Sequence, residues 1–498
     1  MKLVIFALTG VLAMSGFATV RPASVFNHNM VLQQGRRVPV WGTADAGEKV
    51  SVVYGGERKT CVAGSDGKWR LDLEPMAASA TPLNLTIGSC VFTNVVVGEV
   101  WLCSGQSNMS LRLWGDPQVS KHAGRDTDGY FDAALVDMPQ VRACTVPCEW
   151  DVCERSDFRG KLVWKPFSPG TQRDLSAIAF HYATILHTAL RVPVGVIVAA
   201  WGGAAIAPWI SPDGFRSVPS IAKFADVKLV NSKDGKIATD EEDARNPAAA
   251  QSAKKKRVYP SQCRILWNAM IRPLVPFAIR GAIWYQGEAD RGMGSRYYNY
   301  LEALWNGWSK AFEVPELSFY LVQLAPFGGY GERPDRFCEI WTAQERFAED
   351  HAFAGMVSTV DVGEQDNIHP CRKRTVAMRL AAMALNRDYG RKDIPCECPK
   401  VLSCQAQGDA VLISFEHVRA WSRCGDEQPG EFEVAGTNGV FKAATVEYGK
   451  GTLKVLSKDV ESPKAVRYLW SWQLTGKLKN ECGLPVPPFC VNVQGDDK

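Results

Sequence analysis

The pattern of hydrophobic and polar positions changes twice along the chain. From residue 22 to about residue 95, short runs alternate between apolar and polar positions, and glycine-rich turn signals separate them. A period of two is typical of a strand with one buried face, and its regular repetition predicts a small β-sandwich. The predicted strands are residues 38–41, 49–54, 68–73 and 83–87.

After residue 95, apolar runs alternate with segments whose apolar positions recur at helical spacing. This alternation predicts a mostly parallel sheet with helices on both faces. The predicted strands are residues 192–200, 278–285, 317–324 and 354–362. The predicted helices are residues 177–190 (with Ser176 as N-cap), 265–276 (interrupted by Pro273), 297–312, 336–349 and 373–385. Two polar stretches, at about 114–167 and 226–257, are predicted to be insertions.

From about residue 395 the alternating pattern returns. The predicted strands are residues 410–415, 430–435, 452–456 and 465–470. We therefore predict the α/β class, with a parallel-sheet domain over residues 96–392. A β domain at residues 19–95 precedes it, and a second β domain at residues 393–498 follows it.

The N-terminus has the pattern of an export signal. Lys2 precedes an apolar run over residues 3–12, and small residues lead to a predicted cleavage after Ala18. A membrane anchor is the alternative, but the segment is short and no stop-transfer pattern follows it. Residues 1–18 are therefore predicted to be a signal peptide. We expect a secreted or periplasmic protein with no stable membrane insertion after cleavage.

Composition excludes some classes of protein. A net charge of +4 on 498 residues argues against a nucleic-acid binder with a broad basic surface. Fifteen cysteines in an exported chain predict some disulfides, with at least one thiol unpaired because the total is odd. Zinc is an alternative for the cysteine clusters at 144–153 and 396–404, but no histidine lies there at ligand spacing. We predict no metal and no cofactor.

The candidate chemistry begins where the first apolar run of the central domain ends. This run starts at residue 95 and stops abruptly in Gly105-Gln106-Ser107-Asn108. Gly105 allows a sharp turn, and Ser107 would then lie at the carboxyl edge of the sheet, where open α/β sheets bind ligands. Met109 replaces the glycine of a Gly-x-Ser-x-Gly pattern, so the motif is a different one. A serine nucleophile also needs a base to take its proton.

Elimination among the seven histidines favours His369 as that base. The others fall in predicted β domains, an insertion or helices: His28, His417, His122, His181, His187 and His351. His369 follows the predicted strand 354–362 at the same sheet edge as Ser107. Asp366 is spaced to fold back onto its ring, although a structural Asp and His in one loop is the alternative on spacing alone.

A tetrahedral intermediate needs hydrogen-bond donors for its oxyanion. The backbone N–H groups of Ser107 and Gly203 are candidates, since Gly202-Gly203 follows the predicted strand 192–200. The side-chain amides of Asn108 and Gln286 lie at the same predicted edge. For the glycines a tight turn is the alternative role, and for Gln286 the capping of a strand end.

Four blocks together resemble the sialate O-acetylesterase family of SGNH-type carbohydrate esterases: residues 98–109, 201–203, 280–288 and 368–370. Residues 30–33, 483–485 and 488–489 extend the resemblance into both β domains. The resemblance implies a flavodoxin-like three-layer SGNH hydrolase domain. It also implies Ser107 as nucleophile, His369 as base and Asp366 as third member.

The same resemblance implies an oxyanion hole formed by Gly203 with Asn108 or Gln286. Gln106 and Glu288 lie in the matching blocks and are expected at the oxyanion or substrate site. Many relatives carry an acid directly before the Ile-His pair, where this chain has Asn367.

The implied activity is a cofactor-free carbohydrate O-acetylesterase, with an O-acetylated sialic acid as the first substrate expected. A polysaccharide such as acetylated xylan is the alternative substrate, and a non-catalytic carbohydrate-binding protein is the alternative of another class. Trp114, Trp209 and Trp284 either stack on sugar faces or pack in the core.

Overall fold

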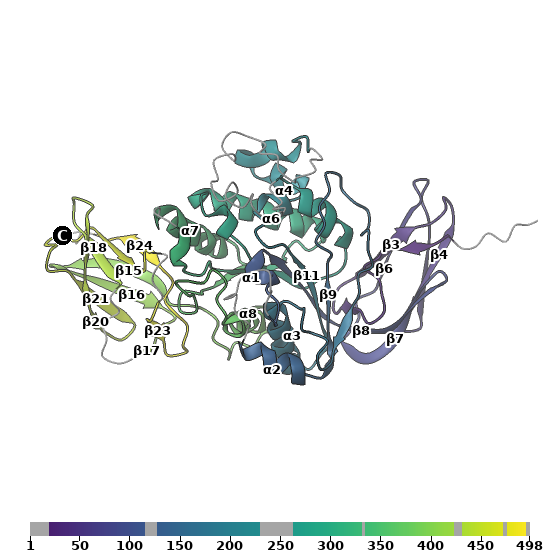
Figure 1. Ribbon diagram of the computed structural model, residues 1–498, viewed down its shortest axis with the longest axis horizontal. Coiled ribbons are helices and arrows are strands. Elements are labelled where there is room, and N and C mark those ends of the chain that lie inside the picture. Colours follow the sequence, from purple (N-terminus) through teal and green to yellow (C-terminus); the bar gives the residue numbers. More distant parts are fainter. Residues whose placement is uncertain are drawn as a thin grey trace, which may run out of the picture.

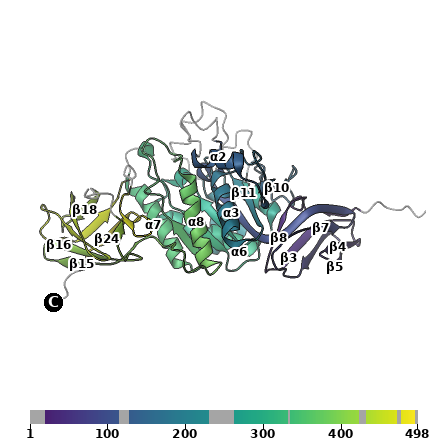
Figure 2. The ribbon, with the colours of Figure 1, turned by 90° about the horizontal axis from the view of Figure 1, so that it is seen from below.

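A computed structural model describes residues 19–114, 127–229, 262–330, 334–422, 431–471 and 476–494. It shows an elongated molecule in which a central α/β unit separates two β domains (Figures 1 and 2). The predicted signal peptide and most of the second predicted insertion lie outside the described residues.

The N-terminal β domain has the alternation that the sequence predicts. Its strands are β1 (Arg21–Pro22), β2 (Val31–Gln33), β3 (Val38–Thr43), β4 (Lys49–Tyr54), β5 (Glu57–Val62), β6 (Lys68–Leu73) and β7 (Ser79–Ile87). In β4 every second residue is buried, from Val50 to Tyr54. The four predicted strands are confirmed. The prediction missed β5, which pairs only with β4 and has no buried residue to produce an apolar pattern.

A single long strand, β8 (Cys90–Gly105), joins this domain to the central unit. Its first half pairs with β7 and β2, and its second half lies in parallel between β11 (Val194–Ala200) and β12 (Gly281–Tyr285). The boundary predicted near residue 95 therefore falls inside one continuous strand. This strand ends at the carboxyl edge of the central sheet, immediately before Gln106 and Ser107.

The central sheet has the strand order β10-β9-β11-β8-β12-β13-β14. Its other strands are β9 (Met138–Thr145), β10 (Lys165–Phe167), β13 (Ser318–Val322) and β14 (Ala354–Val357). All neighbours from β9 to β14 are parallel, and only the edge strand β10 is antiparallel. The prediction of a mostly parallel sheet is confirmed.

Helices cover both faces of this sheet. On one face α3 (Ala177–Leu190) packs against α8 (Lys373–Arg387), and both contact the strands (Figure 2). On the other face α6 (Tyr297–Ala311) packs beside α7 (Pro334–Asp350). Successive residues of β8 feed opposite cores: Leu102 belongs to the α6 side and Cys103 to the α3 side. Ser176 caps α3 as predicted, with its Oγ accepting from the Ala179 N–H at 3.2 Å.

One prediction for the central unit is wrong, and another needs refinement. Residues 114–167 are not only an insertion, because they supply β9 and β10 to the sheet. Arg142, in the middle of β9, is buried and donates to the carbonyls of Met30 and Asn94, so a charged residue stands where an apolar one would have signalled a strand. The predicted helix over 265–276 is confirmed as a helical segment through residue 274, but it is irregular: residues 265–266 are α-helical, a π turn follows at Trp267–Ile271, and a 3-10 turn at Arg272–Leu274 ends it.

The C-terminal β domain consists mainly of two four-stranded antiparallel sheets. The first contains β15 (Lys400–Gln407), β16 (Ala410–Glu416), β20 (Thr445–Tyr448) and β21 (Thr452–Leu456). The second contains β18 (Phe432–Ala435), β19 (Phe441–Ala443), β22 (Ala465–Tyr468) and β24 (Phe489–Asn492). All four predicted strands of this domain are confirmed.

The part of the chain that the structure describes contains no disulfide bond, so the predicted disulfides are not shown there. The thiols of Cys103 and Cys144 are instead buried in the core, where burial raises their pKa and they pack as small apolar groups. Within the same ranges, no group of side chains could hold a metal ion, and no helix has the length and apolarity to cross a membrane.

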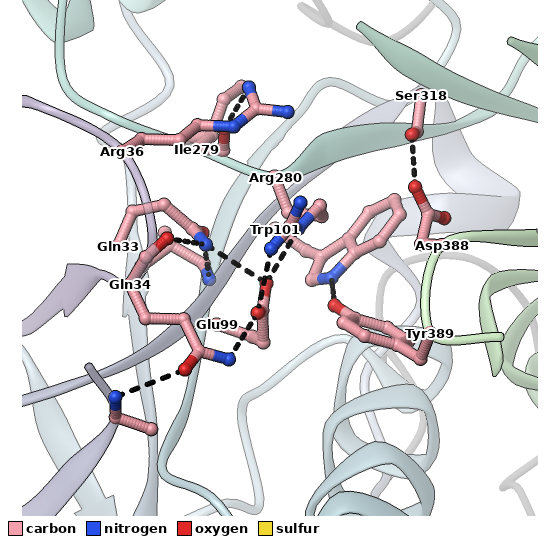
Figure 3. Close-up of polar contacts among 12 residues, drawn as sticks. Gln33, Gln34, Arg36, Glu99, Trp101, Ile279, Arg280, Ser318, Asp388 and Tyr389 are labelled. Carbon is pink, nitrogen blue, oxygen red and sulfur yellow. Dashed lines mark hydrogen bonds and ion pairs between the residues drawn. The ribbon is translucent and has the colours of Figure 1, made fainter. Parts of the chain in front are cut away.

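A buried polar network holds the joint between the N-terminal domain and the central sheet (Figure 3). The carboxylate of Glu99 is fully buried and accepts hydrogen bonds from Gln33, Gln34 and Arg280. Gln33 also accepts from the Val100 N–H at 2.8 Å. Because these groups come from both domains, the network fixes the direction in which β8 enters the sheet.

Candidate active site

A sharp turn presents Ser107 at the end of β8. Gly105 has a φ of +136°, and an added Cβ would lie 2.1 Å from the carbonyl oxygen of Tyr285. The Gln106 N–H donates to that same oxygen at 3.0 Å. Only glycine fits this approach. The half-buried Ser107 then begins the short helix α1 (Ser107–Ser110).

The glycine turn after β11 lies against Ser107. The Trp201 N–H donates to the Gly105 carbonyl at 3.0 Å, and an added Cβ on Gly202 would lie 3.6 Å from Ser107 Cβ. Gly203 has a φ of +77°, which favours glycine. Within the described ranges, the backbone N–H groups of Ser107 and Gly203 meet no acceptor. Both predicted backbone donors are therefore available at this edge.

Asn108 joins the serine turn to the histidine loop. Its Nδ2 donates to the Ile368 carbonyl at 3.0 Å and to Glu288 Oε1 at 2.5 Å. Its Oδ1 accepts from the ammonium group of Lys373. The residue after Ser107 is thus bonded to the residue before His369. Both amide hydrogens of Asn108 are donated to acceptors inside the protein. The side chain therefore connects the two loops and has no hydrogen left for the oxyanion, in contrast to the expectation from the sequence.

Two buried ionisable side chains, Glu288 and Lys373, flank this amide. Burial raises the pKa of the Glu288 carboxyl, and the hydrogen bond from Asn108 and the charge of Lys373 partly oppose that rise. Glu288 Oε2 is buried without a hydrogen-bond partner among the described residues. The Lys373 ammonium lies 5.4 Å from the centre of the Tyr285 ring, within the range of a cation–π interaction. Glu288 therefore accepts a hydrogen bond that holds the Asn108 side chain in place. This geometry gives no support to its predicted contact with substrate.

The Gln286 side chain is also hydrogen-bonded to groups inside the protein. Its Nε2 donates to Asp290 Oδ2 at 2.7 Å and lies 3.1 Å from both Gln106 Oε1 and the Ala204 carbonyl, while its Oε1 accepts from the Tyr297 hydroxyl at 2.7 Å. The side chain is fully buried. With its amide hydrogens committed to these acceptors, Gln286 has no donor left for an oxyanion, contrary to the expectation from sequence.

Gln106 is buried beside Ser107, and its orientation is fixed. Its Oε1 accepts from the backbone N–H groups of Gly287 at 3.4 Å and Ala289 at 3.2 Å. The side chain therefore ties the serine turn to the segment that follows β12.

The histidine loop is shaped by two side chains that are not among the predicted site residues, Glu364 and Asn367. The Glu364 carboxylate accepts from the Cys371 N–H at 2.7 Å and from Asn367 Nδ2 at 2.9 Å. Asn367 Oδ1 in turn accepts from the His369 N–H at 3.0 Å. Neither Glu364 nor Asn367 lies in a recognisable motif, because these bonds depend on how the loop folds back on itself.

Asp366 does not contact His369. Its side chain is exposed, and it has neither a hydrogen-bond nor an ion-pair partner among the described residues. The local reason is that Glu364 and Asn367, rather than Asp366, point into the loop. The structure thus supplies no geometry in which Asp366 orients the imidazole.

The remaining aromatic and histidine candidates have other roles. Trp209 and Trp284 are fully buried and pack edge to face, 6.1 Å apart, so they belong to the core. Trp114 is partly exposed, and the guanidinium of Arg173 lies 4.2 Å from its ring centre. His351 bonds to Glu302 at the end of α7, away from the sheet edge.

Comparisons with known proteins find carbohydrate esterases among the proteins similar to this chain. A family model described as "Carbohydrate esterase, sialic acid-specific acetylesterase" matches residues 246–386, a range that contains Gln286, Glu288 and His369. The sialate O-acetylesterase of Rattus norvegicus is 27% identical, with 95% of this chain and 94% of that protein covered. The Homo sapiens sialate O-acetylesterase is also 27% identical, with 94% and 92% covered.

One solved structure resembles the whole molecule. A carbohydrate acetylesterase from Xanthomonas citri superposes with a TM-score of 0.79 and 26% sequence identity, covering 95% of this chain and 100% of the other. The similarity therefore includes both β domains as well as the central sheet.

Proposed function

Since the chain is related to the sialate O-acetylesterases over nearly its whole length, we propose that it is a carbohydrate acetylesterase that removes acetyl groups from O-acetylated sialic acids. We propose an SGNH-type hydrolase for the central domain, acting after export of the chain. The observation that carries the catalytic assignment is the hydrogen bond from Asn108 to Ile368. It links the immediate neighbours of Ser107 and His369, which come from segments 260 residues apart.

In the proposed reaction, Ser107 Oγ attacks the acetyl carbonyl while His369 accepts the hydroxyl proton. The tetrahedral intermediate collapses to an acetyl-enzyme, and His369 returns the proton to the departing sugar oxygen. A water molecule, deprotonated by His369, then attacks the acetyl group. Acetate leaves and Ser107 recovers its proton.

The oxyanion is assigned to two backbone donors. The N–H groups of Ser107 and Gly203 have no acceptor among the described residues and belong to adjoining turns. Such preorganised donors stabilise the developing negative charge without rearrangement. Asn108, Gln286, Gln106 and Glu288 are assigned to support these turns. His369 is proposed to act without Asp366.

The purified protein tests this assignment with p-nitrophenyl acetate as substrate. Ser107→Ala and His369→Ala are each expected to lower kcat by about 10³-fold or more. Ser168→Ala, at a partly exposed position, and His28→Ala, at an exposed one, are the matched controls and should keep full activity. Turnover that survives Ser107→Ala would exclude the proposed mechanism.

The substrate is tested by acetate release from O-acetylated sialic acid and from acetylated xylan in parallel. We expect a higher kcat/KM on the sialic acid. A preference for xylan would move the assignment to polysaccharide deacetylation, because both substrates use the same acyl chemistry.

A further inference from the structure

Lys373 occupies an unfavourable position for a lysine. It is the first residue of α8, where the helix dipole disfavours a positive charge, and its side chain is only 1% exposed. Burying an ammonium group is costly unless it is paired and hydrogen-bonded. Interactions with neighbouring groups must therefore offset the cost of burial and the unfavourable helix dipole. The described ones are the hydrogen bond to Asn108 and the contact with the Tyr285 ring.

Those contacts lead directly to the proposed active site. The Lys373 ammonium donates to Asn108 Oδ1, and the carboxyl group of Glu288 accepts from the Nδ2 of the same amide. A cation on the oxygen and a carboxylate on the nitrogen permit only one orientation of the Asn108 amide. In that orientation Nδ2 faces the Ile368 carbonyl.

We propose that Lys373 is a positioning residue, which orients Asn108 so that the His369 loop is held against the Ser107 turn. This inference rests on the proposed function, since it concerns the same reaction. The contacts described for the Lys373 ammonium are with the Asn108 amide and the Tyr285 ring, rather than with Ser107 or Gly203. It acts through one amide that connects the two halves of the site.

A second buried cation of the same helix shows what a purely structural role looks like. Arg379 donates to the Asp361 carboxylate through Nη1 and Nη2, both at 2.7 Å, and to the Ser358 carbonyl at 2.7 Å. Its partners lie in the segment after β14 and do not include the Ser107 turn. Lys373 differs because its bond ends on the residue next to Ser107.

Lys373→Met tests the proposal by steady-state kinetics on p-nitrophenyl acetate. We expect kcat to fall by about 100-fold with KM nearly unchanged, because a displacement of about 1 Å between reacting groups has an effect of that size. Arg374→Met removes the neighbouring cation of α8, which among the described residues pairs with Asp132 at 3.5 Å, and should leave kcat unchanged. If the Met variant does not fold, Lys373→Gln keeps an N–H donor without the charge, and we expect a fall of about 10-fold.

A double-mutant cycle separates this role from general destabilisation. If Lys373 acts through Asn108, Lys373→Met should have little further effect on kcat in an Asn108→Ala background. Full additivity of the two effects, or a kcat within twofold of the wild type for Lys373→Met, overturns the proposal. Turnover that does not depend on Ser107 overturns the proposed function and this inference together, whereas serine-dependent turnover with a normal Lys373→Met variant overturns the inference alone.

Discussion

Arg280 donates two hydrogen bonds to the carboxylate of Glu99, through Nε at 3.0 Å and Nη2 at 3.1 Å (Figure 3). The pair joins β8 to the residue before β12, at the opposite end of the strands from Ser107. The centre of the sheet is therefore held at both ends, by this ion pair at the amino edge and by the Gly105 turn at the carboxyl edge.

Removing one partner of the Glu99–Arg280 pair should destabilise the fold strongly. In Arg280→Met the fully buried Glu99 carboxylate loses its countercharge, and we expect a loss of about 3–5 kcal/mol in the free energy of unfolding. Urea denaturation measures the effect. Arg391→Met breaks a two-bond pair with Asp393 on the exposed surface, and should leave stability unchanged. Equal effects of the two substitutions would contradict the assignment.

Gly105→Ala should prevent normal folding of the serine turn. The added methyl group would stand 2.1 Å from the Tyr285 carbonyl oxygen, so β8 and β12 would have to separate. Thermal unfolding should show a large drop in Tm, or no soluble protein at all. Gly408→Ala is the matched control: Gly408 also has a positive φ, +62°, but its added Cβ meets nothing within 4 Å. It should cost only about 1–2 kcal/mol.

Asp366→Asn should have little effect on activity. The carboxylate is exposed and has no partner among the described residues, so kcat/KM is expected to stay within about twofold of the wild type. Loss of a carboxylate that orients a catalytic imidazole would instead cost about 10⁴-fold. Glu364→Gln is the companion variant. We expect it to lower kcat, because one of the two N–H donors in the histidine loop loses its acceptor.

Glu345 predicts a pH dependence of stability. Burial, assisted by the charge of Glu349, raises the pKa of this carboxyl to about 7 from 4.5. Below pH 4.5 the group is protonated in both the folded and the unfolded state. Between pH 4.5 and 7 the unfolded chain loses its proton while the folded protein keeps it, so the free energy of unfolding falls as pH rises.

The expected loss across that window is about 3 kcal/mol as an upper limit, from 1.36 kcal/mol for each pKa unit. Glu345→Gln should flatten this part of the stability curve, measured by urea denaturation at several pH values. Glu447→Gln, at an exposed position of β20, should leave the curve unchanged. A curve that stays equally steep in Glu345→Gln would show that another group is responsible.

The local patterns of the sequence determined most of the secondary structure. Helix α3 begins after Ser176 and covers the predicted residues, because apolar periodicity and the cap agree there. β9 escaped prediction because buried Arg142 is satisfied by carbonyls of another domain. A sequence window shows the charge of such a residue but not its distant acceptors.

The sequence by itself determined the chemistry that is present: a serine after an apolar strand, a histidine after another, and glycines where the backbone must turn. Only the tertiary structure decided which of these polar groups keep a hydrogen that is not bonded inside the protein. Asn108 and Gln286 could donate to an oxyanion by residue type, yet their hydrogens bond to Ile368, Glu288 and Asp290. Lys373, with no motif to mark it, bonds to Asn108, the residue next to Ser107. The physical reason is that a hydrogen bond depends on where partners far apart in the chain come to lie, and residue spacing carries no information about that distance.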